Sequence, residues 1–163
     1  MPSRRKTREF VLQVLFAADC QNQDPLKALG LLGDNFVDDE EVIGTNRVMM
    51  DFAVELIGAI SRERDAIDEM IARLSHNWKI HRMSMVDRNV LRMAVAEITS
   101  FPEIPALVTL NEAVDLGKKY GTDNSPAFIN GILDRIHSFK NVDSGELTVR
   151  DLLVRLDESD TTG

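Results

Sequence analysis

The sequence predicts an all-α fold, and three observations carry that prediction. Apolar residues recur at helical rather than alternating spacing, aromatic residues are only 6% of the chain, and glycine and proline are few. No segment offers a convincing strand. With 163 residues, of which 44% are hydrophobic, the chain is long enough to bury a core as one domain or two very small ones.

The N-terminal half is expected to form a helical bundle over about residues 1–80. A first helix is predicted from about Ser3 to Asn22, where the sequence NQDP stops it. A short second helix is predicted in PLKALGLLG, and the following DNFVDDEEVIGT reads as an acidic loop or frayed turn. From about Asn46, the sequence supports one long helix or two consecutive helices with a bend near SRERD.

The C-terminal half is expected to form a second bundle over about residues 81–140, and capping signals mark its helices. The sequences SMVD, from Ser84 to Asp87, and TLNE, from Thr109 to Glu112, both fit the capping box. In this motif a hydroxyl and a carboxylate each bond one of the backbone N–H groups left unpaired at a helix start. Both motifs therefore predict helix starts.

Further turn and capping residues complete the second bundle. In SPAF, Ser125 is expected at the N-cap and Pro126 at the first helical position, where a missing N–H costs nothing. The sequence SFPEIP ends one helix, because residues before proline are pushed out of the α region. Gly121 is expected as a left-handed C-cap.

Composition and motifs exclude several classes of function. Cys20 is the only cysteine and cannot form an internal disulfide, which favours a reducing cytoplasm. The three histidines have no metal-ligand spacing, so no metal or cofactor is expected. No apolar stretch reaches the length of a membrane span, so no membrane association is expected. The chain has no Walker loop, no GxGxxG, no HExxH and no Cys-His nucleophile pattern. An enzyme is therefore not expected.

The chain begins with the cation-rich sequence RRKTR, which is unexpected in a protein with a net charge of −8. At 100° per residue, one face of the first helix is apolar and should meet the core, whereas Arg5, Arg8, Leu12 and Phe16 fall on the opposite face. Cations at a helix N-terminus oppose the macrodipole by a few tenths of a kcal/mol each, about 0.3 or more. A phosphate-bearing ligand is the simplest explanation for them.

Three stretches of the chain carry a family resemblance: RRKTREFVLQVLFAAD, MSMVDRNVLRMAVAEI and IPALVTLNEAVDLGKKYGTDNSPAFINGILDRI. They resemble the NusB family of bacterial transcription antitermination factors, and the resemblance covers most of residues 4–137. The resemblance implies an all-α fold of two perpendicular three-helix bundles. Here an additional helical tail would follow them.

The resemblance also implies a function without catalysis or cofactor. Members of the family bind boxA RNA in nascent transcripts together with NusE, which is also a small-subunit ribosomal protein. They act with RNA polymerase and other Nus factors to read through terminators in ribosomal RNA operons. Single-stranded RNA would suit an acidic protein with one basic edge, because phosphates meet the cations while bases stack on aromatic rings.

The resemblance assigns roles to individual residues, and other readings stay open for several of them. Contacts with RNA are implied at Arg4, Arg5, Lys6, Arg8, Tyr120 and Phe128, and Lys118, beside Lys119, would extend the basic track. Tyr120 and Phe128 would otherwise be core residues. The NusE-facing surface would include Phe16, its neighbour Leu12 and Asp87, although Asp87 would equally serve as a cap.

Residues 141–163 are expected to form an acidic tail with a short amphipathic helix. TVRD fits a capping box beginning at Thr148, and four apolar residues recur on one face after it: Val149, Leu152, Leu153 and Leu156. This stripe would pack on the chain's own bundle. Alternatively it would dock on a neighbouring subunit or mask the binding surface with Asp157, Glu158 and Asp160.

Two other functions and the oligomeric state stay open. A NusB-like RNA-recognition module occurs in certain ribosomal RNA cytosine methyltransferases, but it would need a catalytic domain. A protein-only helical adaptor would bind no RNA. The free protein would be a monomer or a homodimer.

Overall fold

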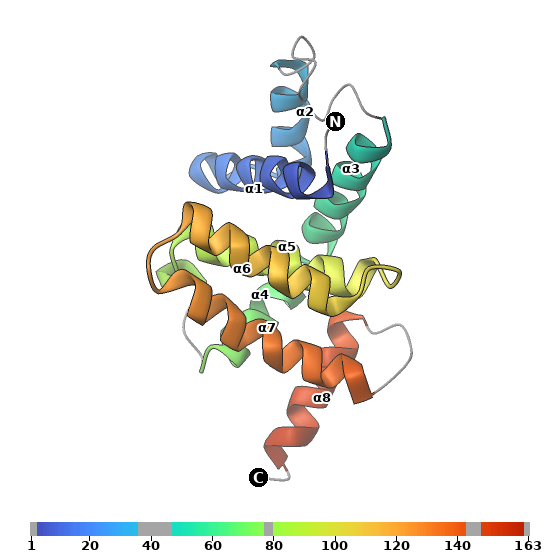
Figure 1. The fold of residues 1–163 in the computed structure, drawn as a ribbon, viewed down its shortest axis with the longest axis vertical. Coiled ribbons are helices and arrows are strands. Elements are labelled where there is room, and N and C mark those ends of the chain that lie inside the picture. The colour runs from blue at the N-terminus through green and yellow to red at the C-terminus, as the bar shows by residue number, and fades with distance from the viewer. Residues whose placement is uncertain (1–2, 36–46, 77–79, 143–147, 162–163) are drawn as a thin grey trace. The chain divides into compact units, whose positions relative to one another are not determined.

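The computed structural model describes residues 3–35, 47–76, 80–142 and 148–161, and the regular elements in these ranges are all helical (Figure 1). The predicted all-α class is confirmed. The chain divides into two compact units, Met1–Arg62 and Glu63–Gly163. The predicted acidic loop DNFVDDEEVIGT lies outside the described residues, except for its first two positions.

The first unit contains α1 (Arg4–Gln21), α2 (Pro25–Asn35) and α3 (Arg47–Arg62). The predicted limits of α1 are confirmed, because the Ser3 hydroxyl accepts the Lys6 N–H over 3.2 Å and Asn22 ends the helix in the left-handed region at φ 52°. The helix packs against both α2 and α3. Asp24 starts α2 by accepting the Leu26 N–H over 3.0 Å, and Ser61 of α3 donates to the same carboxylate.

The second unit contains all the later elements: α4 (Arg64–Leu74), the 3₁₀ helix η2 (Ile80–Arg82), α5 (Met85–Ser100), α6 (Ala106–Tyr120), α7 (Ser125–Val142) and α8 (Val149–Thr161). The break between α3 and α4 at Glu63 confirms the bend near SRERD. Because α4 packs on α5, α7 and α8, it belongs to the second unit, and the division along the chain falls between residues 62 and 63.

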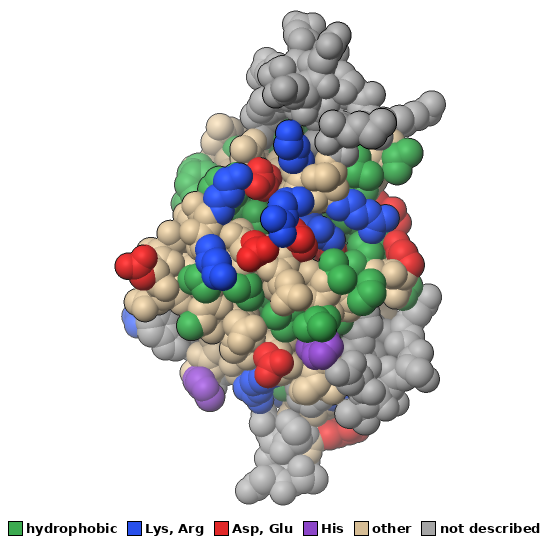
Figure 2. Space-filling model, in the orientation of Figure 1, with side chains coloured by type: hydrophobic (Ala, Val, Ile, Leu, Met, Phe, Trp, Pro, Cys, Tyr) green, Lys and Arg blue, Asp and Glu red, His purple; other side chains and the backbone are tan. Residues whose placement is uncertain are grey.

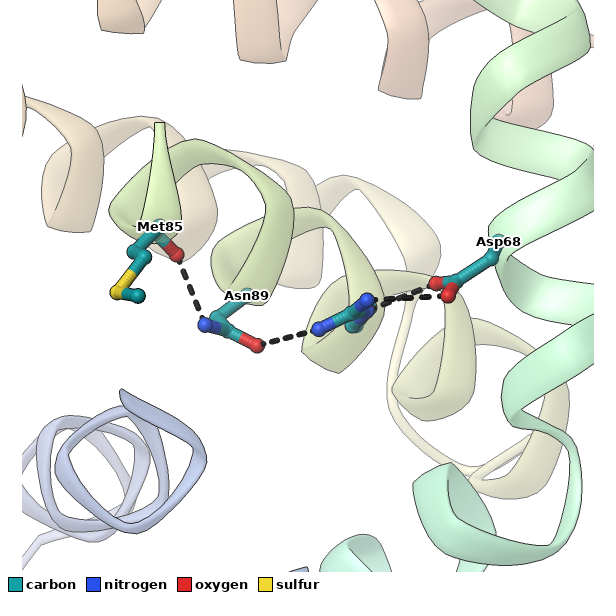
Figure 3. A network of polar contacts seen from close by, with 4 residues as sticks. Asp68, Met85 and Asn89 are labelled. Carbon is teal, nitrogen blue, oxygen red and sulfur yellow. Dashed lines mark hydrogen bonds and ion pairs between the residues drawn. The ribbon is translucent and has the colours of Figure 1, made fainter. Parts of the chain in front are cut away.

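The centre of the second unit is α5, in which every residue from Asn89 to Ile98 is buried. A polar network crosses this helix (Figure 3). The Arg92 guanidinium donates to both carboxylate oxygens of Asp68 on α4, over 2.7 and 3.0 Å, and to the Asn89 side chain over 3.1 Å. Asn89 in turn donates to the Met85 carbonyl over 2.9 Å. The network thus ties α4 to the first turn of α5.

The predicted start of α6 at Thr109 is wrong. The helix begins at Ala106, directly after Pro105, so Thr109 lies one turn inside it. The Thr109 hydroxyl donates instead to the buried Glu97 carboxylate of α5 over 2.9 Å, and both residues are almost fully buried. A hydroxyl that resembled a helix cap therefore satisfies a buried carboxylate on a neighbouring helix.

Two glycines permit the close packing of α6 and α7. The expected left-handed cap at Gly121 is wrong, because its backbone is extended at φ −95° and ψ −160°. A Cβ at Gly121 would overlap the Ser125 side chain, and a Cβ at Gly117 would lie 2.7 Å from Ile129. Ser125 was expected as N-cap but is the first residue of α7, and its hydroxyl accepts the Thr122 N–H in the preceding turn.

The predicted tail helix is confirmed as α8, together with its capping box. Thr148 N–H donates to Asp151 over 3.0 Å, and Asp151 N–H donates to the Thr148 hydroxyl over 3.1 Å. Three of the four stripe residues are buried, and Leu153 is half-buried. The helix packs on α4, α5 and α7 of its own unit, and Asp157 pairs with Arg73 of α4. The tail thus packs on its own bundle, and the side chain of Asp160 is outside the described part.

Candidate nucleic-acid interface

The first turn of α1 carries three exposed cations, Arg4, Arg5 and Lys6. The Ser3 cap fixes the helix at this end, and the first turn contains no acidic residue. Positive charge here is locally unfavourable, because backbone N–H groups already give a helix start a partial positive charge. The arrangement suits a ligand that brings negative charge, such as a phosphate group.

Arg8 does not lie on the exposed face where it was predicted. It is only 3% exposed, and its guanidinium lies 5.9 Å from the ring centroid of Phe52 on α3. The Arg4 guanidinium approaches the same ring at 5.1 Å from an exposed position. Both contacts are cation–π interactions within the first unit. Arg8 is therefore a packed residue, and its role in RNA binding stays a prediction.

The predicted pairing of Leu12 with Phe16 on an exposed face is wrong for Leu12. Leu12 is 5% exposed, whereas Phe16 is 42% exposed. The face of α1 that is buried is wider than a single stripe, since the helix packs against two neighbours within its unit. Phe16 remains a large apolar side chain open to solvent, on the same helix as the basic turn.

A second group of predicted residues lies at the C-terminal end of α6. Lys118, Lys119 and Tyr120 form its last turn, and all three are exposed. The Lys119 ammonium lies 5.4 Å from the ring centroid of Tyr120. Tyr120 is thus not a core residue, because 39% of its surface is open. An exposed aromatic ring beside lysines is suited to stacking with an RNA base.

The second unit brings Asp87 and Phe128 together in one cavity of about 570 Å³. One face of α7 forms a wall through Phe128, Gly131 and Arg135, which are spaced three to four residues apart. The start of α5 and the segments around Leu74 and Arg82 complete the lining. Phe128 is half-buried there, so it is neither a full core residue nor fully exposed.

Asp87 is anchored by its backbone and leaves its carboxylate at the cavity. Its N–H donates to the Ser84 hydroxyl over 3.0 Å, which confirms Ser84 as the N-cap of α5. In the predicted capping box, the Asp87 carboxylate would also accept a hydrogen bond from the Ser84 N–H. Its buried oxygen Oδ1 does not form this bond, because it has no hydrogen-bond partner in the described part of the chain. The side chain of Asp87 is thus not explained by capping.

The sequence interpretation missed Arg82, Arg135 and Asn124, which also line this cavity. The spacing of Arg135 from Phe128, seven residues along one helix, was a signal that they share a face. No comparable signal pointed to Arg82 or Asn124, because they reach the cavity only through the packing of separate segments.

Surface charge on the face drawn in Figure 2 is mixed, with Lys and Arg side chains beside Asp, Glu and hydrophobic side chains. Within the described ranges, no three His, Cys, Asp or Glu residues are grouped to hold a metal ion. No helix among the described residues has the length and apolarity to cross a membrane. The exposed cations and open aromatic rings define a helical protein equipped to bind an anionic partner.

Comparison with known proteins gives the family. The chain belongs to the NusB family, whose model matches residues 5–138. It is 42% identical to the transcription antitermination protein NusB of Desulforapulum autotrophicum, over 90% of this chain and 99% of that protein. It is 45% identical to that of Geotalea uraniireducens, over 85% of this chain and 96% of that protein.

Solved structures agree with this assignment. T. maritima NusB superimposes with a TM-score of 0.73 at 35% identity, covering 84% of this chain and 92% of that one. A chain from a crystal structure of antitermination factors NusB and NusE in complex with dsRNA matches with a TM-score of 0.71 at 26% identity, covering 83% and 96%. The relatives are antitermination proteins by name, and none of them is named as an enzyme.

Proposed function

We propose that this protein is a transcription antitermination factor that binds boxA-type RNA together with NusE and promotes read-through in ribosomal RNA operons. The family supports this function, and a relative of the same fold has been solved with NusE and RNA. The observation that carries it here is the exposed basic start of α1, Arg4 to Lys6, which has no acidic residue in its first turn, on a chain with net charge −8. In this proposal the protein acts without catalysis, with RNA polymerase and other Nus factors, in the cytoplasm where transcripts are made.

Each of the two units carries residues of its own for the proposed contacts. The exposed cations of α1 bind phosphates, and Phe16 on the same helix contacts NusE. At the end of α6, Lys118 and Tyr120 offer a further charge and an open ring. A protein with a net charge of −8 repels nucleic acid away from its basic turns, and this repulsion orients the contact.

The methyltransferase-linked module and the protein-only adaptor are less well supported. The two curated relatives described above are matched over 96% and 99% of their own lengths and are antitermination proteins by name. A protein-only adaptor leaves the cations of α1 unexplained.

RNA binding tests this function directly. Fluorescence anisotropy should show that boxA-type single-stranded RNA binds more tightly than a scrambled RNA of equal composition, and that added NusE increases the affinity. Equal binding of the two RNAs, with and without NusE, would contradict the proposal.

The NusE surface is tested by Phe16→Ala, with Leu12→Ala as a matched control on the same helix. Phe16 is open to solvent, so its loss should weaken NusE binding by about 1–3 kcal/mol, the range for an aromatic anchor, and should leave the melting temperature nearly unchanged. Leu12→Ala should do the opposite and lower stability by about 2–5 kcal/mol. Normal NusE binding by Phe16→Ala would remove Phe16 from the interface.

A further inference from the structure

The cavity between α5 and α7 contains polar groups that neither the fold nor the proposed contacts of α1 use. Its volume of about 570 Å³ lies within the range of roughly 300–1,000 Å³ that is usual for sites of small organic ligands. Buried apolar side chains, Leu74, Met83 and Ile132, form part of its lining. Such a cavity, with a few converging polar groups, is the usual form of a ligand site.

Two arginines supply positive charge to this cavity. Arg82 is the last residue of η2 and Arg135 lies on α7, and both are exposed. Among the described residues, neither guanidinium takes part in an ion pair such as the one that holds Arg92 to Asp68. Unpaired guanidinium groups bind phosphate strongly, since their donors match its oxygens.

The Asp87 carboxylate supplies hydrogen-bond acceptors to the same cavity. Its buried oxygen has no donor within the described part of the protein, and a carboxylate can only accept hydrogen bonds. Leaving such an acceptor unpaired is unfavourable. A ligand that brings N–H donors to this point would remove that penalty.

The α7 wall supplies an aromatic side chain and open space. Phe128 is half-buried at the cavity, and unpaired RNA bases commonly stack on aromatic side chains. One turn further on, Gly131 has no side chain, and a Cβ built there would meet no atom within 4 Å. The wall therefore leaves room beside the ring.

We propose that this cavity is a guanine subsite for one nucleotide of the bound RNA, an inference that rests on the proposed RNA-binding function. The base stacks on Phe128 and donates N1–H and N2–H to the Asp87 carboxylate, while Arg82 and Arg135 bind adjacent phosphates. Guanine is the base whose Watson–Crick edge carries two adjacent donors. Adenine and cytosine offer one amino group beside an acceptor nitrogen, and uracil offers one N–H between two carbonyls.

Replacing guanine by inosine, which lacks the N2 amino group, tests this assignment on the intact chain. BoxA-type single-stranded RNA should bind about tenfold more weakly when the guanine that occupies the cavity is replaced, as expected for one lost hydrogen bond to a charged group. In Asp87→Asn the difference should fall below about threefold, because the amide has one acceptor oxygen and loses the charge. Folding should persist, because the Ser84 cap bonds the backbone of Asp87.

Gly131→Leu tests the cavity without touching a charged group. The added side chain enters open space and should leave melting unchanged or raise it, but it should fill the cavity and abolish the preference for guanine over inosine. Gly30→Leu on α2 is the matched control, since a Cβ there also meets nothing within 4 Å. The control should retain the full preference.

The remaining outcomes would overturn the assignment. Equal binding of every guanine and inosine RNA, or a preference that survives in Asp87→Asn and Gly131→Leu, would show that the cavity does not read guanine. If Asp87→Asn weakened NusE binding while the preference persisted, Asp87 would be a protein contact. Guanosine monophosphate binding as tightly as the RNA would assign the cavity to a free nucleotide. Failure of the chain to bind any RNA, alone or with NusE, would overturn the proposed function itself.

Discussion

Arginine has opposite uses at the start of α1 and in the middle of α5. Arg4 and Arg5 are exposed, whereas Arg92 is 5% exposed and donates to Asp68 and Asn89. Arg8 is an intermediate case, because it is buried like Arg92 but contacts the ring of Phe52, as Arg4 does. The comparison teaches that burial and pairing commit a guanidinium to stability, while an exposed cation lies where a ligand can reach it.

Removing the partner of Arg92 should have the largest effect. Asp68→Ala leaves a buried guanidinium uncompensated, so the free energy of unfolding should fall by about 3–5 kcal/mol in urea titrations. Glu69→Ala, at the exposed neighbouring position, should change it by about 0.5 kcal/mol or less. Similar losses for both variants would mean that the Arg92 network does not stabilise the fold more than an exposed side chain does.

Arg8→Ala should have an intermediate effect on stability. It removes a buried side chain and its cation–π contact, and we expect a loss of about 1–2 kcal/mol. Arg5→Ala is the exposed control on the same helix and should melt like the wild type. If Arg8→Ala melts normally but binds RNA poorly, Arg8 belongs with the ligand-binding cations instead.

The triple variant Arg4→Ala, Arg5→Ala and Lys6→Ala should hardly alter melting but should change RNA binding. At roughly 0.7 per phosphate contact, the slope of log affinity against log salt should become shallower by about 2. Anisotropy titrations at several salt concentrations measure this slope. A slope equal to that of the wild type would show that the phosphate contacts lie elsewhere.

The smallest effect is expected at the acidic start of α8, the counterpart of the basic start of α1. Hydrogen bonds from the Thr148 backbone and hydroxyl hold the pKa of Asp151 below its ordinary value of 3.8. A lowered folded pKa gives stability that is present above pH 3.8 and is lost as the pH falls through the folded pKa. Asp151→Asn should therefore melt slightly below the wild type at pH 6 and converge with it near pH 2.

A control at another exposed aspartate separates this effect from general acid destabilisation. Asp134→Asn on α7 is this control, because it removes an exposed carboxylate without touching Thr148. If both variants converge with the wild type in the same way, the Thr148 hydrogen bonds are not the cause.

Local patterns predicted the helices well, because periodicity and caps depend on near neighbours in sequence. Ser84 and the Thr148 capping box cap as expected, and Ser3 caps the helix that was expected to start there. The errors came where tertiary contacts overrule a local signal. Thr109 fits a capping box but bonds Glu97, twelve residues away, and no spacing rule reveals that contact.

The binding residues were predictable to different degrees. The basic turn and the open Phe16 follow from composition and helical geometry. Leu12 and Arg8 were misplaced because the burial of a face depends on how many helices pack against it. The cavity could not be predicted as a whole, since Asp87, Phe128 and Arg82 come from separate segments that meet only in the folded unit.

The ten consecutive buried residues of α5 have a consequence for exchange with solvent. A helix packed by α4, α6, α7 and α8 has no face through which its backbone can open alone. Its amide protons from Asn89 to Ile98 should exchange with deuterium only when the whole unit unfolds, whereas those in the first turn of α8 should exchange through local fraying. Mass spectrometry of deuterated peptides would therefore find α5 as the last segment of this unit to take up label.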